Sequence, residues 1–410
     1  MNKTELMSFI KNKDFLRLWG SQLFSQITTH LINFILILKI FEMTNSAVAV
    51  SLLWIFYLIP AIILGPFSGT IIDLLDKRKT LFYTNLCQAV IVLGYLLVKE
   101  QVLLIYPIVF IYSLVNQLYL PAEGSALPIL VPKTRYPAAN SIFLFTAYGS
   151  FLAGFTIAGP LVKLMGKENP FFLTFVFLLL AALAVYKLPK NLKMEKKKVT
   201  DFTDFWDQVK AGYLLIKERR SLLFPILLLS FTQIVVAILG VIVPLYATEV
   251  LSLALVNSAL ILVTPAGAGA ILGLILLVRF FMPQKRKKRL ISAGLFLGSL
   301  ALFMLALVVP LISLGKIFLA VSASFMLGLC FVFVLLPSQT FIQENAPANF
   351  LGRIYGVLGF TITVFSVLPL LLAGTIAELL GVRTLCFIIS LIALFLGINI
   401  NRREVYANHP

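Results

Sequence analysis

The stretch "GTIIDLLDKRKT", residues 69–80, places two aspartates and three consecutive basic residues directly after the apolar run "AVAVSLLWIFYLIPAIILGPFS". The chain becomes apolar again immediately after this stretch. A run of about 20 apolar residues is long enough for one helix to cross a bilayer. The stretch is therefore predicted to be a short charged connection between two membrane-spanning helices.

The composition extends this interpretation to the whole chain. Of the 410 residues, 60% are hydrophobic and 12% are charged, whereas a soluble domain carries about 25% charged residues. The first apolar run has no small-residue cleavage site, so we interpret it as an uncleaved span. These features favour an all-α membrane protein that crosses the bilayer many times.

The chain has three cysteines, and all of them lie inside apolar runs: Cys87, Cys330 and Cys386. An odd number of cysteines without metal-ligand spacing indicates neither a disulfide framework nor a zinc site. We therefore expect the cysteines to pack against neighbouring helices, and we expect no metal and no cofactor.

Twelve apolar runs have the length of a membrane span. They cover residues 15–41, 47–73, 80–99, 102–127, 138–165, 169–187, 222–247, 254–282, 289–312, 316–343, 352–380 and 383–401. One long polar segment separates the sixth run from the seventh. The predicted organisation is an N-terminal half of six helices (1–187), a cytoplasmic linker (188–221) and a C-terminal half of six helices (222–410). Helical spacing of apolar residues at 202–217 predicts an amphipathic helix on the inner membrane surface.

The basic residues are distributed unequally between the two sides of this arrangement. If the N-terminus lies inside, 26 of the 34 Lys and Arg residues fall in the segments on the cytoplasmic side. Basic residues gather in the cytoplasmic loops of membrane proteins. We therefore predict a multi-pass protein of the cytoplasmic (inner) membrane with both termini in the cytoplasm. The same distribution accounts for the net charge of +17 without nucleic-acid binding.

An internal repeat supports the division into halves. The fourth run ends in "LPAEGSALPILVPK", residues 120–133, and the tenth ends in "LPSQTFIQENAPAN", residues 336–349. Each has Leu-Pro near the end of a span and a second proline about ten residues later. Parallel repeats of this kind build transporters around an axis normal to the membrane.

The twelve runs and the charged connection resemble the Major Facilitator Superfamily, whose connection at this place reads Gly-x-x-x-Asp-Arg-x-Gly-Arg/Lys-Arg/Lys. The matching residues are Gly69, Asp73, Lys77 and Arg78. Leu74 replaces the usual arginine, and Asp76 replaces the second glycine, which is similar to the macrolide-efflux-like branch. Residues 15–26, 120–141 and 337–356 also resemble that branch.

The resemblance implies the Major Facilitator fold and a transporter rather than an enzyme. It also implies a conformational-switch connection, formed by Gly69, Asp73, Asp76, Lys77, Arg78 and Lys79 together with Gly352 and Arg353 at the start of the eleventh run. In the family, the aspartate contacts the start of the eleventh helix and latches the outward-open state. The alternative is a solvated connection that only fixes orientation, and Leu74 puts the strength of the latch in question.

The fifth run holds small residues at four-residue spacing in "GSFLAGFTIAGPLVKLMG", residues 149–166. Small residues let helices approach closely, and proline weakens a helix locally. Gly149, Gly154, Gly159 and Pro160 are therefore predicted to be helix-packing positions. The Gly-Pro pair resembles a motif of antiporters in the family, with plain packing as the alternative. The glycine-rich stretch 265–273 lacks a following Lys-Ser/Thr, so we predict packing there and no ATP site.

His30 lies halfway along the first run. Ionisable groups inside a membrane are costly and face a cavity or a partner, although a histidine packed in the core is the alternative. The resemblance implies that the first, fourth and seventh helices line the substrate cavity. The predicted cavity residues are Gln26, Thr29, His30, Asn33, Asn116, Gln117, Thr232 and Gln233.

Acidic residues are absent from the middle of the runs, which favours a neutral or weakly polar, largely apolar substrate. The candidates for proton coupling are Asp73, Glu123 and His30. We therefore predict a monomeric secondary transporter that exports amphipathic, macrolide-like or multidrug-like molecules by alternating access, driven by protons. Antibiotic resistance is one role that such export would have, and housekeeping export is the alternative. Alternatives are a lysolipid flippase or siderophore exporter of the same fold, and a scaffold or receptor that transports nothing. Two histidines and no paired carboxylates argue against a membrane enzyme.

Overall fold

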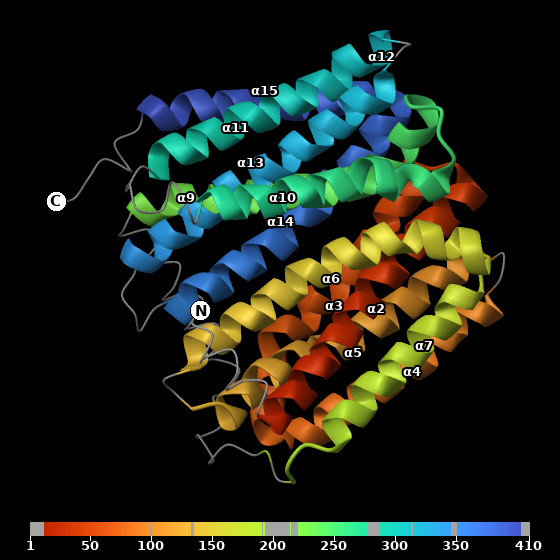
Figure 1. Ribbon diagram of the computed structural model, residues 1–410, viewed down its shortest axis with the longest axis vertical. Coiled ribbons are helices and arrows are strands. Elements are labelled where there is room, and N and C mark those ends of the chain that lie inside the picture. The colour runs from red at the N-terminus through yellow and green to blue at the C-terminus, as the bar shows by residue number, and fades with distance from the viewer. Residues whose placement is uncertain are drawn as a thin grey trace. The chain divides into compact units, whose positions relative to one another are not determined.

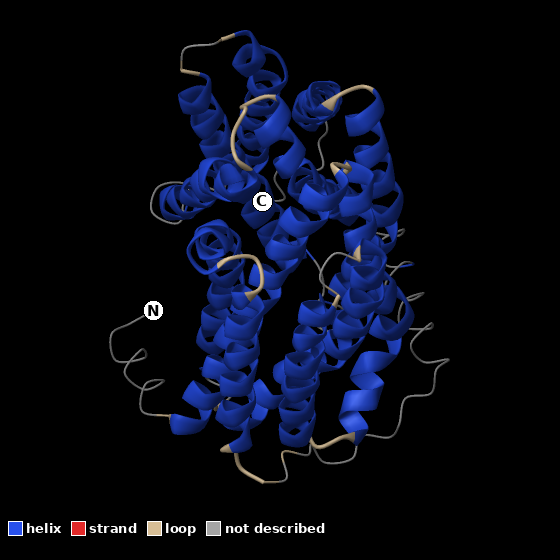
Figure 2. Ribbon diagram, turned by 90° about the vertical axis from the view of Figure 1, so that its right-hand side faces the viewer, coloured by secondary structure: helices blue, strands red, loops and turns tan. Residues whose placement is uncertain are grey.

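The computed structural model describes residues 12–98, 101–132, 135–190, 192, 214, 220–277, 287–312, 315–345 and 351–402 of the chain. These residues form helices and short connections, and none of them lies in a β-strand (Figure 2). Twelve helical segments among them are long and apolar enough to cross a membrane, with mean hydropathies between 1.5 and 2.7. A helix satisfies its own backbone hydrogen bonds, which lipid cannot do, so the apolar composition and the all-helical fold have one cause.

The helices form two compact units. The first contains Met1–Met43 and Leu53–Phe205, and the second contains Thr44–Leu52 and Trp206–Pro410. The division after Phe205 falls inside the predicted linker 188–221. The amphipathic helix predicted for 202–217 lies outside the described residues except for Leu214, which is exposed.

Six helices supply the first unit, although the first residues of α3 are grouped with the second unit. They are α2 (Lys13–Thr44), α3 (Ala47–Leu74), α4 (Lys77–Leu97), α5 (Val102–Leu130), α6 (Tyr136–Met165) and α7 (Asn169–Tyr186). Helix α4 packs against both α5 and α7, and α6 contacts α7 (Figure 1). Three prolines lie inside α5 and one lies inside α6, and both helices continue past them.

The second unit is built around α13. Its longer helices are α9 (Arg220–Glu249), α10 (Thr264–Leu276), α11 (Lys287–Phe303), α13 (Lys316–Asn345), α14 (Leu351–Leu379) and α15 (Val382–Arg402). Helix α13 packs against α9, α10 and α11, while α15 packs against α11 (Figure 1). Helix α14 packs against α9.

Two spans of the second unit contain π-helical turns that the sequence did not indicate. The turn η3 (Ala259–Val263) follows the 3₁₀ turn η2 (Leu255–Asn257) and leads into α10. The turn η6 (Met304–Val308) connects α11 to the short α12 (Val309–Leu311). Both turns lie within apolar sequence, where apolar residues alone do not distinguish one helical hydrogen-bond pattern from another.

Helices α10 and α13 approach until their backbones touch. A Cβ on Gly269 would lie 2.0 Å from the carbonyl oxygen of Phe325, and a Cβ on Gly328 would lie 1.7 Å from the carbonyl oxygen of Ala266. Only glycine fits at either position. This confirms the packing role predicted for the glycine-rich stretch 265–273.

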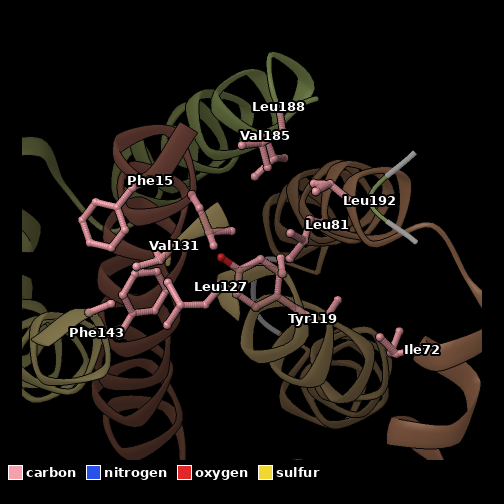
Figure 3. Close-up of a cluster of buried hydrophobic side chains, with 14 residues drawn as sticks. Phe15, Ile72, Leu81, Tyr119, Leu127, Val131, Phe143, Val185, Leu188 and Leu192 are labelled. Carbon is pink, nitrogen blue, oxygen red and sulfur yellow. The ribbon is translucent and has the colours of Figure 1, made fainter. Parts of the chain in front are cut away.

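A cluster of buried apolar side chains holds one end of the first unit together. It includes Phe15 of α2, Leu81 of α4, Tyr119 of α5 and Phe143 of α6 (Figure 3). The residues that contribute come from all six helices of the unit and from the chain just after α5 and α7. The charge distribution predicts that this end of the unit is cytoplasmic. The charged connection of residues 69–80 therefore lies at the end of the first unit that this buried apolar cluster holds together.

Candidate functional site

The charged connection consists mainly of helix ends. Gly69 and Asp73 lie in α3, which ends at Leu74, and α4 begins at Lys77. Only residues 75 and 76 separate the two helices, so the loop is shorter than the apolar pattern predicted. The surroundings of Gly69 and Asp73, and of Gly352 and Arg353 in the first turn of α14, lie outside the described residues. The latch through Asp73 therefore stays a prediction.

Asp76 is the N-cap of α4. Its Oδ1 atom accepts a hydrogen bond of 3.0 Å from the backbone N–H of Lys79, and its own carbonyl oxygen accepts from the Thr80 hydroxyl at 2.9 Å. An aspartate at this position satisfies one of the N–H groups that a helix start leaves without a partner. A residue predicted to belong to the switch thus also starts a helix.

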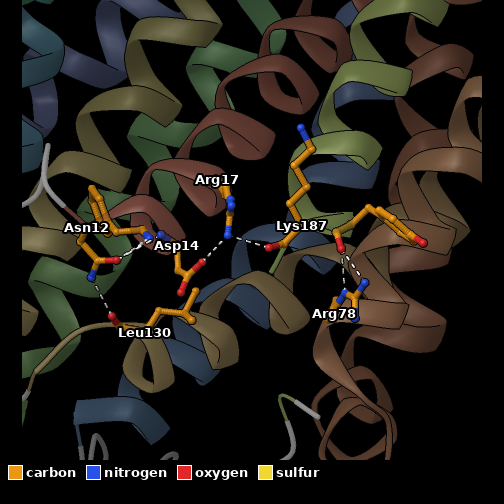
Figure 4. Close-up of polar contacts among 8 residues, drawn as sticks. Asn12, Asp14, Arg17, Arg78, Leu130 and Lys187 are labelled. Carbon is orange, nitrogen blue, oxygen red and sulfur yellow. Dashed lines mark hydrogen bonds and ion pairs between the residues drawn. The ribbon is translucent and has the colours of Figure 1, made fainter. Parts of the chain in front are cut away.

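The side chains of Lys77 and Arg78 donate hydrogen bonds to backbone carbonyl oxygens. Lys77 is fully buried, and its Nζ donates to the carbonyl oxygen of Leu75 at 3.3 Å. The Arg78 guanidinium donates to the carbonyl oxygen of Tyr186 and lies over the ring of the same residue (Figure 4). Both residues were predicted to belong to the switch connection, and that role stays a prediction. Only Lys79 of the three basic residues is exposed, because the start of α4 is packed against the end of α7.

A second arginine reaches the end of α7 from α2. Arg17 donates to the carbonyl oxygen of Lys187 at 2.7 Å and pairs with Asp14 at 2.7 Å (Figure 4). Asn12 joins the start of α2 to the carbonyl oxygen of Leu130 at the end of α5. Cationic side chains at a helix C-terminus satisfy its last carbonyl groups and oppose its dipole.

His30 packs among aromatic rings. Its ring lies edge-on to Phe151 with a centroid separation of 5.2 Å, and the ring of Phe155 is 6.3 Å away. Its Cβ lies 2.7 Å from the position that a Cβ on Gly154 would occupy. The surroundings of His30 in the first unit are therefore those of the packed histidine that the sequence left as the alternative. Its role as a cavity residue stays a prediction.

Three of the other predicted cavity residues are buried within the first unit: Thr29, Asn33 and Asn116. The Thr29 hydroxyl lies 2.9 Å from the hydroxyl of Tyr112. Asn116 accepts from Gln88 at 3.3 Å and donates to the Tyr57 hydroxyl at 3.3 Å. These side chains belong to a larger group of hydrogen-bonded polar residues, which we call the buried polar cluster.

The buried polar cluster joins four helices. Its members are Ser21, Ser25, Thr29 and Asn33 of α2, Tyr57 of α3, Asn85 and Gln88 of α4, and Tyr112, Ser113, Asn116, Tyr119 and Glu123 of α5. Eight of the twelve are not among the residues singled out from sequence, and only the spacing of polar residues in the first and fourth runs would have indicated most of them. The other predicted residues, Gln26 and Gln117, are half-buried, and Gln117 donates to the Ser113 carbonyl oxygen of its own helix.

Glu123 is the acidic member of the cluster. Its side chain is 6% exposed, and its Oε1 accepts a hydrogen bond of 3.2 Å from the Tyr119 hydroxyl. Within the described part of the chain Glu123 takes part in no ion pair. A carboxylate is expensive to bury without a cation, so a proton is the simplest way to neutralise it. Of the two predicted coupling residues whose surroundings are described, Glu123 suits reversible protonation better than His30, which packs against aromatic rings.

The second unit contributes an apolar cavity of about 50 Å³ among α9, α11, α13 and α15. Its lining includes Thr232, Phe331 and Cys330. Thr232, a predicted cavity residue, uses its hydroxyl to donate to the Leu228 carbonyl oxygen at 2.8 Å, so its methyl group is the part free to contact a ligand. Gln233, the other predicted residue of α9, is half-buried.

The small residues of α6 have different surroundings. A Cβ on Gly154 would meet His30 and the backbone nitrogen of Leu31 within 2.9 Å, whereas a Cβ on Gly149 would meet none of the described atoms within 4 Å. Five residues of helix turn the direction by about 140°, so the two glycines face different ways and Gly149 is not a close-packing position in the described structure. Helix α6 continues through Gly159 and Pro160 to Met165, so a weakening at this pair, which stays a prediction, does not end the helix.

The three cysteines also differ in how deeply their side chains are buried. Cys386 is buried and Cys330 is half-buried against the Gly298 position, where a Cβ would lie 2.5 Å from its sulfur. Cys87 is exposed on α4, so the packing predicted for all three is wrong for this one. Its side chain lies on the face of α4 opposite the buried Asn85 and Gln88.

Comparison with known proteins adds the family. The sequence pattern of the Major Facilitator Superfamily matches residues 18–369. The MFS-type transporter YfiS of Bacillus subtilis is 25% identical over 397 residues, which cover 95% of this chain and 93% of YfiS. Macrolide efflux protein A of Streptococcus pyogenes is 21% identical over 375 residues, or 90% of each chain.

Solved structures show the same fold. The POT family transporter PepTSo superposes with a TM-score of 0.77 at 14% identity, covering 97% of this chain and 98% of PepTSo. The nucleoside transporter NupG gives a TM-score of 0.75 at 13% identity, covering 96% and 99%. With the family pattern and twelve apolar helices, these comparisons establish the predicted fold. The chain is a multi-pass membrane protein with the Major Facilitator fold, and it belongs to the Major Facilitator Superfamily of transporters.

Proposed function

We propose that the protein exports amphipathic small molecules across the cytoplasmic membrane by alternating access, and that proton uptake drives the export. Macrolide efflux protein A, which aligns with nine tenths of this chain, is by its name an exporter of macrolides. The scarcity of ionised groups in the described spans favours a substrate that is largely apolar.

The proton coupling rests on one observation, the burial of Glu123. In the described part of the chain its hydrogen-bond partner is the Tyr119 hydroxyl, which can donate to the ionised carboxylate and accept from the protonated acid. Either charge state therefore keeps a hydrogen bond, which allows the group to bind and release a proton in each transport cycle. Asp73 is proposed to latch one state of the cycle against the start of α14, as the resemblance to the family implies.

The test is the accumulation of a compound panel in cells that lack their own efflux pumps. The panel contains macrolides, other amphipathic drugs, a lysophospholipid and a siderophore, so that the alternative cargoes are measured in the same experiment. Wild-type protein is compared with Glu123→Gln, Asp73→Asn and His30→Ala, with and without a protonophore. Glu344→Gln serves as the matched control because Glu344 is an exposed acid of the second unit whose ion pair contributes little.

We expect wild-type protein to lower the accumulation of at least one amphipathic drug in a manner that the protonophore abolishes. Glu123→Gln and Asp73→Asn should lose this effect, and Glu344→Gln should keep it. Export of the lysophospholipid or siderophore alone would replace the proposed cargo. Levels equal to empty vector across the panel, with the protein present in the membrane, would overturn export altogether. Protonophore-sensitive export by Glu123→Gln would remove Glu123 from the coupling.

A further inference from the structure

Two rows of polar side chains run along α2 and α5 in the first unit. On α2, Ser21, Ser25, Thr29 and Asn33 recur every fourth residue, and their exposed fractions lie between 0% and 7%. On α5, the row consists of Tyr112, Asn116, Tyr119 and Glu123, spaced by three or four residues and equally buried. Residues at these spacings share one face of a helix, so each row is a continuous polar stripe inside an otherwise apolar span.

The two rows are joined by hydrogen bonds at the end that contains Glu123. The Tyr119 hydroxyl contacts the Glu123 carboxylate at 3.2 Å and the Ser21 hydroxyl at 3.4 Å. Ser21 in turn accepts from the side-chain amide of Asn85 at 3.1 Å. Glu123 is therefore connected through a tyrosine and a serine to α4.

A second set of hydrogen bonds joins the rows nearer the middle of the span. The Thr29 hydroxyl donates to the Ser25 carbonyl oxygen at 3.0 Å, so the 2.9 Å contact with Tyr112 must use the tyrosine proton. Gln88 donates to Asn116, and Asn116 donates to the Tyr57 hydroxyl. Ser113 fixes the same part of α3 by donating to the Tyr57 carbonyl oxygen at 2.6 Å.

Between these two sets lie polar atoms that have no protein partner. The side-chain oxygens Oδ1 of Asn85 and Oε1 of Gln88 are buried and make no hydrogen bond in the described structure. They lie three residues apart on α4, on the side that provides amide donors to Ser21 and to Asn116. Buried amide oxygens without partners are rare in folded proteins and mark the positions of internal water. Water at these oxygens would connect the set at Glu123 with the set at Tyr57.

The connected groups would extend across much of the membrane. Twelve residues separate Ser21 from Asn33, which corresponds to about 18 Å of helix at 1.5 Å per residue. The hydrocarbon core of a bilayer is about 30 Å thick. Polar groups over this length inside spanning helices are costly and have a functional reason.

Among the described titratable groups near this path, Glu123 is the carboxylic acid that can take up the proton. Tyrosines face it from α5 and α3, while α2 and α4 contribute serines, a threonine and amides. Charged side chains described at the same end of the unit include Asp14, Arg17, Asp76, Lys77 and Arg78. Arg17 pairs with Asp14 and donates to the Lys187 carbonyl oxygen, and Asp76 caps α4. Lys77 and Arg78 donate to the carbonyl oxygens of Leu75 and Tyr186 respectively. Arg135 and Tyr136 lie at the start of α6, and the Tyr136 hydroxyl donates to Pro128.

We propose that the buried polar cluster is a hydrated proton path that connects Glu123 with the middle of the membrane, with internal water at Asn85 and Gln88. A hydronium ion that reaches the carboxylate transfers one proton, forms one O–H bond on Glu123 and leaves one water molecule. Along the path each hydroxyl or water accepts one proton and passes on another, so none is consumed. The Tyr119 hydroxyl relays a proton in this path, and Gln88 is a positioning residue that holds water. The proposal rests on proton coupling through Glu123 but makes a separate claim about water.

Radiolytic hydroxyl-radical labelling with mass spectrometry tests the water directly and requires no substrate. The full-length protein in nanodiscs is irradiated, and oxidation of Tyr119 is compared with that of Tyr246. Both tyrosines are almost fully buried, but Tyr246 lies in the second unit and donates to the Leu305 carbonyl oxygen at 2.7 Å. We expect Tyr119 to be labelled and Tyr246 to be protected. Equal protection of both would show a dry cluster and overturn the proposal.

Two variants then test whether the water serves proton movement. Gln88→Met keeps the side-chain length but removes the amide, and Tyr119→Phe removes the hydroxyl. Thr84→Val is the control on α4, because the Thr84 hydroxyl donates only to carbonyl oxygens of its own helix. Gln88→Met should lower Tyr119 labelling, whereas Thr84→Val should not. Thermal unfolding identifies any variant that fails to fold, and the second variant then carries the test.

Proton flux separates this proposal from the proposed function. With a compound that the accumulation panel identifies, Tyr119→Phe and Gln88→Met should lower coupled proton flux in proteoliposomes by about a hundredfold, the low end of what a positioned proton-transfer group contributes. If Glu123→Gln abolishes the flux while both variants retain it, the path is wrong and the coupling stands. If Glu123→Gln retains the flux, the coupling itself fails, whatever the labelling shows.

Discussion

Arg78 and Tyr186 are joined although 108 residues separate them. The guanidinium Nε and Nη2 atoms of Arg78 donate to the Tyr186 carbonyl oxygen at 3.0 and 2.5 Å, and the guanidinium carbon lies 5.1 Å from the centre of the Tyr186 ring. The start of α4 is thereby fixed to the end of α7. One residue of the charged connection thus satisfies a carbonyl group that the helix end leaves without an intrahelical partner.

Replacement of Arg78 should loosen this junction. We expect Arg78→Ala to lower the unfolding temperature in detergent, and Arg78→Lys to recover only part of the loss, because an ammonium lacks the planar pair of donors. A helix C-terminal cation contributes about 0.3–1 kcal/mol when it is accessible to solvent. Lys79→Ala, which changes the neighbouring exposed lysine, is the control. An equal effect of Lys79→Ala would indicate a general charge effect in place of the Arg78 contact.

Two substitutions of Asp76 can separate its role as a helix cap from the effect of its negative charge. Asp76→Ala removes the acceptor of the Lys79 N–H and should destabilise the protein by about 1 kcal/mol. Asp76→Asn keeps an acceptor oxygen and should be nearly as stable as wild type. Both are measured by thermal unfolding and by export of a panel compound. Loss of export in Asp76→Asn with normal stability would show that the carboxylate has a role in the switch beyond capping.

The contact between α10 and α13 should be intolerant of a single methyl group. Gly328→Ala and Gly269→Ala would each place a Cβ within 2.0 Å of a backbone carbonyl oxygen. Separation of the helices should cost about 1–3 kcal/mol, as other overpacked sites do. Gly273→Ala is the matched control on α10, because its Cβ would meet Leu329 at an ordinary 3.4 Å. Equal unfolding temperatures for Gly269→Ala and Gly273→Ala would contradict this packing.

Gly154 and Gly149 of α6 allow the same comparison between a closely packed glycine and a control glycine. A Cβ on Gly154 meets the Leu31 backbone nitrogen at 2.9 Å as well as His30, so Gly154→Ala should lower the unfolding temperature. Gly149→Ala should leave it unchanged or raise it, because alanine favours a helix by up to about 1 kcal/mol over glycine. Adding His30→Ala to Gly154→Ala should restore little of the stability, since alanine keeps the Cβ at position 30 and the backbone contact remains. Full restoration would show that the imidazole ring, and not the Cβ or the backbone, limits the approach.

Much of the fold follows from the sequence. The twelve apolar runs, the 188–221 segment and the Leu-Pro repeats at 120 and 336 predicted twelve membrane helices, because a bilayer requires about 20 apolar residues for each crossing. Helix ends were less accurate. Lys77 and Arg78 were assigned to a loop because a hydropathy pattern treats charge as exposed, whereas the long side chains fold back to backbone carbonyl groups.

The residues of the candidate site were also predicted only in part. Thr29, Asn33, Asn116 and Glu123 were found because polar residues are conspicuous within apolar spans. Their partners Ser21, Asn85, Gln88 and Tyr119 were not singled out. Asn85 and Gln88 are as polar as Asn116, but they lie in the third run, which the family resemblance does not assign to the cavity, while Ser21 and Tyr119 are ordinary residues of a helix. His30 was conspicuous for the same reason as Glu123, yet its described neighbours are the rings of Phe151 and Phe155.

The sequence alone determined that the chain crosses a membrane many times. The hydropathy and length of each span are local properties, and they decide whether that span is stable in lipid without reference to the other spans. Only the tertiary structure decided which polar side chains meet. The bond between Ser21 and Tyr119 spans 98 residues, and the bond between Ser21 and Asn85 spans 64. Such contacts depend on how each helix is rotated against its neighbours, and that rotation is set by packing across the whole unit.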